Sequence, residues 1–173
     1  LKEKPDAVLV YGDTNSTLAG ALVATKLNVP VVHIESGLRS FNKSMPEEIN
    51  RITTDHCSDL LFSPTREGVK NLIAEGISHV VGKQEVYHCG DVMYDNSLYF
   101  NKLALTKSKV LLEADIIKGE FNLVTCHRPS NTDNIDNLST IINSLKEINK
   151  IDGRKIVFPM HPRTEKMINK FFG

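Results

Sequence analysis

The sequence predicts an α/β fold with doubly wound, mostly parallel sheets, and two observations carry this prediction. Short apolar runs, such as "AVLVY" (7–11), "PVVHI" (30–34) and "LLFS" (60–63), alternate along the chain with longer segments of helical periodicity. These runs do not alternate between apolar and polar residues, which is typical of strands buried on both faces of a parallel sheet. Strands joined through helices in this way form right-handed crossovers.

The first part of the chain contains four predicted strands and three predicted helices. The helix after the first strand is indicated by the apolar spacing of Leu18, Ala21 and Leu22. The later elements are, in order, the strand 30–34, a loop over 35–45, a helix from Pro46 to about Ser58, the strand 60–63, a helix over 65–76 with Thr65 as its N-cap, and the strand 86–90.

The second part of the chain repeats the alternation after a helical crossover. The expected elements are helical residues over 91–115 with a break at "TKSK", the strand 121–125, an amphipathic helix over 135–149, the strand 155–159 and a last helix from about Thr164. Because the crossover separates two α/β units, we expect a domain boundary near residue 95, which gives the ranges 1–95 and 96–173.

Composition excludes several classes of function. Lys and Arg together number 21, as do Asp and Glu, so the charge does not favour nucleic-acid or membrane-surface binding. The apolar runs are too short to span a bilayer. Three widely spaced cysteines (Cys57, Cys89 and Cys126) lack zinc-ligand spacing and fit reduced thiols in the cytoplasm. The start "LKEKPDAVLVYG", without Met, suggests a fragment of a longer protein.

Charged side chains follow the predicted strands at the points where they end. Asp13 follows the first strand and Glu35 the second, while His127 with Arg128, and then His161, follow two later strands. Ligands of open α/β sheets bind at the carboxyl ends of the strands, so these side chains are candidates for one site.

Each carboxylate also has a structural interpretation. Asp13 suits the N-cap of the helix that follows it, whereas Glu35 caps nothing obvious. For Glu47 the spacing favours structure: "SMPE" (44–47) matches a capping box, and Glu47 stands four residues before Arg51, where a surface ion pair forms.

The histidines show no metal-ligand spacing, and we expect no metal site. His33, His56, His79 and His88 are interpreted as structural or solvated. His127 and Arg128 could form a turn or hold a phosphate at a helix N-terminus. The chain has no G-x-G-x-x-G or P-loop motif, which argues against a dinucleotide cofactor.

Several blocks, in order, resemble the bacterial non-hydrolysing UDP-N-acetylglucosamine 2-epimerases: "VYGDTNSTLAG", "VVHIESGLRS", "MPEEINRITTDHCSDLLFSPT", "HCGDVMYDN" and "CHRPSNTDNIDNL". The resemblance implies two Rossmann-like domains arranged as in glycosyltransferase-B enzymes. Residues 1–95 would form the C-terminal part of the first domain, and residues 96–173 the first part of the C-terminal, nucleotide-binding domain. The resemblance implies interconversion of UDP-N-acetylglucosamine and UDP-N-acetylmannosamine through 2-acetamidoglucal, for cell-surface polysaccharide. It further implies a cytoplasmic homodimer that uses neither NAD nor a metal.

The resemblance also implies roles for single residues. Asp13, Glu35 and Glu47 match the family's acid–base carboxylates, and Arg51 belongs to its active-site set. His127 matches the histidine near the UDP phosphates, and Arg128 beside it is expected to bind substrate.

The chain departs from the family pattern in two ways. Ser130 stands where the family often has a glutamate in the H-R-x-E-N block. The family's terminal G-T-R-P-E and S-G-G blocks, which meet the UDP, lie outside these 173 residues, so we expect negligible activity from them alone.

Other functions remain open at this point. They are a hydrolysing relative that releases free N-acetylmannosamine, an epimerase for a 2,3-diacetamido uronic acid sugar nucleotide, and a non-catalytic sugar-nucleotide-binding module. A glycosyltransferase would not need three acid–base carboxylates at these positions.

Overall fold

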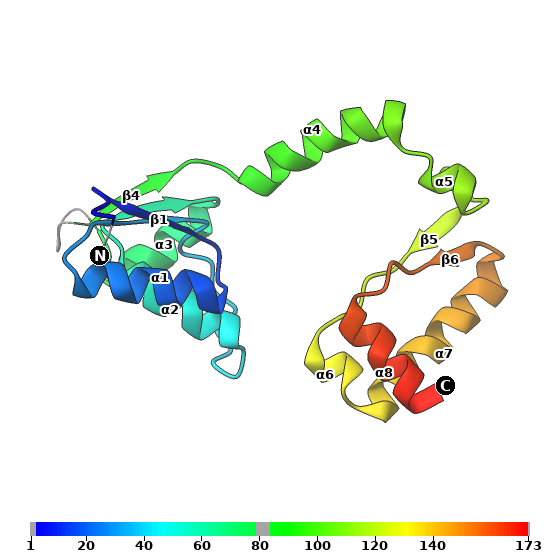
Figure 1. Cartoon of the computed structure of the whole chain (residues 1–173). Helices are drawn as coiled ribbons and strands as arrows, with labels where there is room; N and C mark the ends of the chain where they lie inside the picture. Colours follow the sequence, from blue (N-terminus) through cyan, green and yellow to red (C-terminus); the bar gives the residue numbers. More distant parts are fainter. Residues whose placement is uncertain (1–2, 79–83, 173) are drawn as a thin grey trace. The chain divides into compact units, whose positions relative to one another are not determined.

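The computed structural model describes residues 3–78 and 84–172, in two compact units, Leu1–Lys102 and Leu103–Gly173. Each unit contains a parallel sheet and the helices that connect its strands (Figure 1). The predicted α/β class with parallel sheets is therefore confirmed. The domain boundary expected near residue 95 lies within helix α4 (Val92–Lys107), as does the division between the units, and the domain assignment stays a prediction.

The first unit is built on a four-stranded sheet whose spatial order follows the chain. Its strands are β1 (Val8–Tyr11), β2 (Val31–Ile34), β3 (Leu60–Ser63) and β4 (Glu85–His88), and every neighbouring pair is parallel. The connecting helices are α1 (Asn15–Lys26), α2 (Pro46–Cys57) and α3 (Arg66–Ala74). Figure 1 shows these three helices on one face of the sheet, and within the described residues no helix covers the other face.

The core of this unit lies between the sheet and its helices. One cluster joins small residues of α1 to the first two strands, and it consists of Val10, Ala21, Ala24 and Val31. A second cluster consists of Leu61, Leu72 and Ile77. Because Ala21 and Ala24 have small side chains, α1 packs closely against β1 and β2.

The second unit contains a two-stranded sheet. Strand β5 (Phe121–Leu123) pairs in parallel with β6 (Lys155–Val157), and α7 (Ile135–Asp152) connects them. The other helices are α5 (Val110–Glu113), the single turn α6 (Pro129–Thr132) and α8 (Pro162–Phe172). The expected break at "TKSK" is confirmed between α4 and α5. The last helix begins two residues before Thr164, because Pro162 suits the first helical position.

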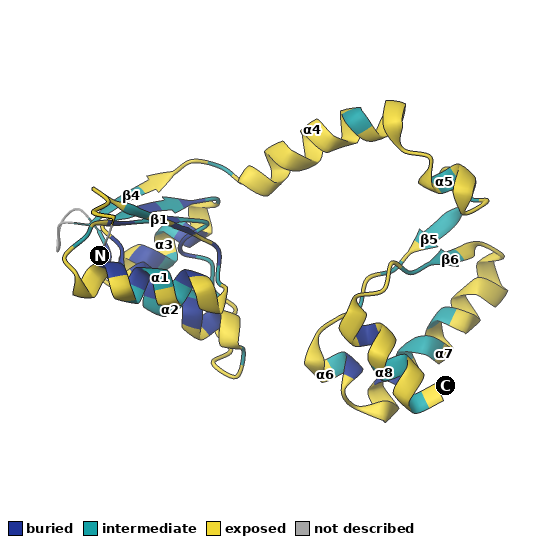
Figure 2. Cartoon of the chain, viewed as in Figure 1, coloured by how far each residue is buried: buried dark blue, intermediate teal, exposed yellow. Residues whose placement is uncertain are grey.

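Helix α4 is exposed along nearly its whole length, as Figure 2 shows. Over the described residues, no helix combines the length and apolarity that crossing a membrane requires.

Candidate active site

Asp13 and Glu35 lie beside each other at the carboxyl ends of β1 and β2. The register places Tyr11 opposite Ile34, so the residues that follow both strands emerge at one edge of the sheet. Gly12 turns the chain with φ +67° and donates its N–H to the Ile34 carbonyl at 3.0 Å. Glu35 has φ +71°, a left-handed conformation that is unfavourable for a residue with a Cβ atom. Its backbone N–H donates to the Phe62 carbonyl at 3.0 Å, which helps to hold it there.

Arg51, from the middle of α2, joins the two carboxylates. Its Nη2 lies 2.9 Å from Asp13 Oδ2 and 2.9 Å from Glu35 Oε1. Both carboxylates are about a quarter exposed, so the group borders solvent on one side. The guanidinium offsets their mutual repulsion and fixes their rotamers. We call Asp13, Glu35 and Arg51 the carboxylate cluster.

The expected N-cap role of Asp13 is wrong. Thr14 is the N-cap residue of α1, and its hydroxyl oxygen accepts a hydrogen bond from the Thr17 N–H at 3.2 Å. Since the cap is supplied one residue later, the Asp13 carboxylate points to Arg51 instead.

Both structural interpretations of Glu47 are also wrong. Met45 is the N-cap residue of α2 and gives no side-chain cap, because the Ser44 hydroxyl donates to Asn42 Oδ1 at 2.7 Å. Arg51 pairs with Asp13 and Glu35 instead, and among the described residues the expected ion pair between Glu47 and Arg51 does not form. Glu47 is exposed in the first turn of α2, one helical turn before Arg51, and has no hydrogen bond or ion pair within the described residues.

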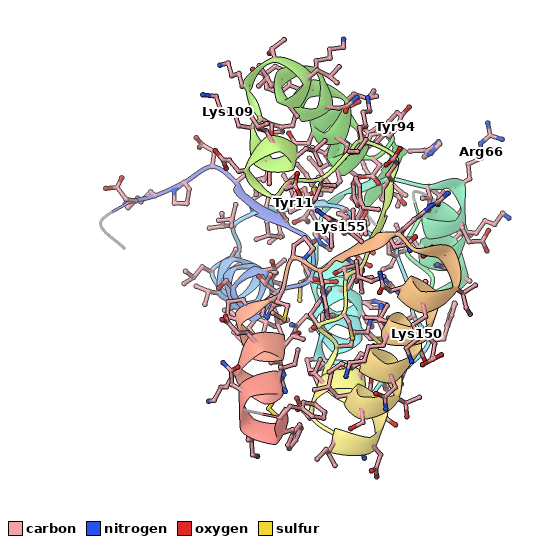
Figure 3. All side chains as sticks on the ribbon, turned by 90° about the vertical axis from the view of Figure 1, so that its right-hand side faces the viewer. Tyr11, Arg66, Tyr94, Lys109, Lys150 and Lys155 are labelled. Atoms are coloured by element: carbon pink, nitrogen blue, oxygen red, sulfur yellow. The ribbon has the colours of Figure 1, made fainter. Side chains whose placement is uncertain are left out.

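Two residues that the sequence interpretation passed over contact this group. The Asn50 amide donates to the Asp13 carbonyl and to Asn15 Oδ1, both at 2.9 Å, and so ties α2 to the turn after β1. Burial, the charge of Glu35 and a hydrogen bond with its side chain raise the pKa of Tyr11, which ends β1 (Figure 3). Asn50 could have been identified from the sequence, because it directly precedes Arg51 in "PEEINR". No sequence feature indicated that Tyr11 contacts the site.

Glu48 holds the loop that leads from Glu35 to α2. Its carboxylate is buried and accepts three hydrogen bonds: from the Ser40 N–H at 2.8 Å, the Ser40 hydroxyl at 2.9 Å and the Phe41 N–H at 2.9 Å. Burial by itself would raise the pKa of Glu48, but these hydrogen bonds outweigh it and hold the pKa below its ordinary value.

Glu48→Gln is therefore expected to destabilise the first unit in a pH-dependent way. An amide nitrogen would face an N–H donor, which costs about 1–3 kcal/mol at neutral pH. Because the folded-state pKa is depressed, the carboxylate stabilises the fold above its unfolded value, about 4.3, and this contribution disappears as the pH falls through the folded value. Urea denaturation of the wild type and of Glu48→Gln, between neutral and acidic pH, measures the difference in their free energies of unfolding. A stability difference that stays constant on acidification would contradict it.

In the second unit, two histidines meet beyond the ends of β5 and β6. The ring centroids of His127 and His161 lie 5.8 Å apart, with an angle of 30° between the planes. The segment is anchored by the buried Thr164, whose hydroxyl donates to the Cys126 carbonyl at 2.7 Å. His127 faces solvent, so its ring is available to a ligand.

Arg128 and Ser130 belong to the turn that follows. Arg128 is the N-cap residue of α6 and Ser130 lies in its only turn, so the expected turn is present. The side chains of His127 and Arg128 are exposed and make no hydrogen bond within the described residues. By contrast, Lys150 and Lys155, both labelled in Figure 3, form ion pairs on the surface of the same unit.

The described residues contain no group of three or more His, Cys, Asp or Glu side chains that could hold a metal ion. His33 is buried and hydrogen-bonded, in keeping with a structural role, while His56 and His88 are more exposed. His79 lies outside the described residues.

Comparison with known proteins links this arrangement to one group of enzymes. A family model described as UDP-N-acetylglucosamine 2-epimerase matches residues 1–173. A UDP-N-acetylglucosamine 2-epimerase homologue of Methanococcus maripaludis is 52% identical over 172 residues, which are 99% of this chain and 46% of the relative. The UDP-2,3-diacetamido-2,3-dideoxy-D-glucuronate 2-epimerase of Pseudomonas aeruginosa is 50% identical over 98% of this chain and 46% of its own length.

A solved structure gives the same result for the fold. The UDP-GlcNAc 2-epimerase of Methanocaldococcus jannaschii, in complex with UDP-GlcNAc and UDP, matches with a TM-score of 0.87 and 44% identity, over 98% of this chain and 46% of that one. The chain thus spans about half the length of the relatives it matches.

Proposed function

Because the chain belongs to the UDP-N-acetylglucosamine 2-epimerase family, we propose that the protein carrying it interconverts UDP-N-acetylglucosamine and UDP-N-acetylmannosamine without net hydrolysis. The observation that carries this proposal is the carboxylate cluster, in which two carboxylates from neighbouring strand ends share one guanidinium at 2.9 Å. Inversion at a sugar carbon requires a proton to leave and to return on opposite faces. Two carboxylates at the carboxyl ends of β1 and β2, with a third at the start of α2, can supply the groups that remove and return this proton.

The proposed reaction is an elimination followed by an addition. A carboxylate takes the proton from C2, the electrons of that bond form the C1–C2 double bond, and the bond from C1 to the UDP oxygen breaks. The resulting 2-acetamidoglucal then receives a proton at C2 on the opposite face, and the UDP oxygen adds again to C1. Asp13, Glu35 and Glu47 are the proposed acid–base groups, with Arg51 holding two of them in place.

The departing diphosphate gains negative charge as the bond to C1 breaks, so the protein must supply donors. His127 and Arg128 are proposed for this role because both side chains are exposed after a strand end and make no side-chain hydrogen bond within the described residues. Hydrogen bonds from cationic side chains to phosphate oxygens strengthen as this charge develops.

The identity of the product tests the proposal. The full-length protein, incubated with UDP-N-acetylglucosamine, is expected to yield a mixture of the two UDP-linked sugars in an NMR spectrum. Accumulation of free N-acetylmannosamine and UDP would instead identify a hydrolysing enzyme.

A second candidate substrate has a specific observation in its favour. The Pseudomonas aeruginosa relative, named for a UDP-2,3-diacetamido uronic acid, is 50% identical to this chain. Both substrates share the C2 proton and the UDP leaving group, so the same cluster could serve either. The kcat/KM values of the full-length protein for the two sugar nucleotides, measured in parallel, decide which of them is the substrate.

Glu47→Gln is expected to lower activity without destabilising the fold, whereas Glu48→Gln is expected to destabilise the fold. Glu47 is exposed and makes no hydrogen bond or ion pair within the described residues, so its change should alter the free energy of unfolding by less than about 0.5 kcal/mol. If Glu47 transfers a proton, the same change lowers kcat by about 100-fold or more. Thermal unfolding and the epimerase assay measure the two effects, with the destabilising Glu48→Gln as the matched control. Full activity in Glu47→Gln would remove Glu47 from the proposed mechanism.

A further inference from the structure

The first unit also contains a chain of buried charged side chains that take no part in the proposed reaction. His33 and Asp55 are fully buried, and Arg39 is 1% exposed. His33 Nδ1 lies 2.7 Å from Asp55 Oδ1, and Arg39 Nη1 lies 2.7 Å from Asp55 Oδ2. Arg39 also binds Glu75 through Nε and Nη2, both at 2.7 Å. Charges buried to this degree are costly unless each is paired, so their arrangement needs an explanation.

The hydrogen-bond partners of His33 determine where its hydrogens lie. Nε2 lies 2.8 Å from the Gly12 carbonyl oxygen, which can only accept, so Nε2 carries a hydrogen. Nδ1 faces the Asp55 carboxylate at 2.7 Å. The other oxygen of Asp55 already accepts from the Gly37 N–H at 3.0 Å and from Arg39 Nη1 at 2.7 Å, so the carboxylate acts as the acceptor in its other contacts. The hydrogen between His33 and Asp55 therefore belongs to Nδ1.

The same contacts tie together the three segments that carry the cluster. Gly12 directly precedes Asp13, Gly37 follows Glu35 by two residues, and Asp55 stands one helical turn after Arg51. Through Gly12, Gly37 and Asp55, the buried pair contacts the turn after β1, the turn after β2 and helix α2.

We propose that His33 and Asp55 form an imidazolium–carboxylate clamp that positions the carboxylate cluster, with both ring nitrogens of His33 donating hydrogen bonds. They are positioning residues, since the distance from each to the cluster is bridged by backbone and not by a direct side-chain contact. The positioning role rests on the proposed function, whereas the protonation of the ring does not.

The clamp predicts a spectroscopic signature that a merely structural histidine would not give. In ¹⁵N-labelled protein at about pH 8, both ring nitrogens of His33 are expected to show one-bond couplings to hydrogen, because each faces a hydrogen-bond acceptor. In Asp55→Asn the new amide can donate to Nδ1 while its oxygen accepts from Gly37 and Arg39. Every hydrogen bond is kept, and the ring is expected to lose the hydrogen on Nδ1.

Glu75→Gln is the matched control, because it makes the same chemical change at the far end of the chain of charges. It should leave both ring hydrogens of His33 in place. A wild-type ring with one bare nitrogen would overturn the clamp, even if Asp55→Asn fails to fold. If Glu75→Gln removes the Nδ1 hydrogen as well, the specific pairing with Asp55 is refuted.

The positioning role is tested by kinetics of the full-length protein. Asp55→Asn is expected to lower kcat by about 10- to 100-fold while KM changes by less than about threefold, because small displacements of catalytic groups impair chemistry more than binding. Glu75→Gln should retain wild-type kcat. Unchanged kcat in Asp55→Asn would overturn the positioning role. A wild-type protein without epimerase activity would refute the proposed function instead, and the ring spectrum would still decide the protonation of His33.

Discussion

Replacing Glu35 by Gln in the full-length protein is expected to abolish exchange of the substrate's C2 proton with solvent. An amide cannot accept this proton, and the loss of one positioned base costs about 10²- to 10⁴-fold in rate. Binding of UDP should persist, since Glu35 is proposed to act on the sugar carbon. Deuterium incorporation at C2 from D₂O, followed by NMR, measures the first effect, and calorimetry with UDP measures the second.

Glu67→Gln is a suitable control for this change. Glu67 lies on α3, is 71% exposed and pairs with Lys70, so its replacement removes the same charge from the same unit and leaves the ion pairs of the cluster in place. Its exchange rate should equal that of the wild type. Normal deuterium incorporation in Glu35→Gln would exclude Glu35 as a base.

Gly37→Ala is expected to be among the most destabilising single changes in the first unit. Gly37 has φ +78°, and a Cβ atom there would lie 2.4 Å from the Gly68 carbonyl oxygen and 2.8 Å from its carbon. The left-handed conformation costs about 1–2 kcal/mol for a residue with a side chain, and a clash with backbone adds about 1–3 kcal/mol. We expect a loss of roughly 3 kcal/mol in the free energy of unfolding, measured by urea denaturation.

Gly76→Ala separates the two contributions. Gly76 has a similar φ of +81°, but a Cβ atom would meet nothing within 4 Å. Its replacement should therefore cost only the conformational part, about 1–2 kcal/mol. Equal losses at the two positions would show that the approach of Gly37 to Gly68 does not limit stability. Because Gly37 donates to Asp55, its replacement should also impair activity in the full-length protein.

Local sequence signals predicted the elements well and the side-chain partners poorly. Strand–helix alternation located β1 to β6, the strands of the described residues, since period and β-branched composition are local properties. Thr65 was identified as a cap because the capping hydrogen bond spans only three residues, and it is present at 2.9 Å to the Gly68 N–H. Ser44 had the same local pattern, yet Asn42 took its hydroxyl. A motif names a possible partner, but competition between partners decides which one is used.

By itself, the sequence determined the α/β class and brought Asp13 and Glu35 forward as candidates, because both follow strands and because their motifs resemble one family. Only the tertiary structure decided that Arg51 serves these two carboxylates and not Glu47, and that His33 lies between Gly12 and Asp55. These contacts join residues 16 to 38 positions apart in the chain, and a local pattern carries no information about them. They arise because parallel pairing brings the ends of β1 and β2 together and α2 packs against both the sheet and α1.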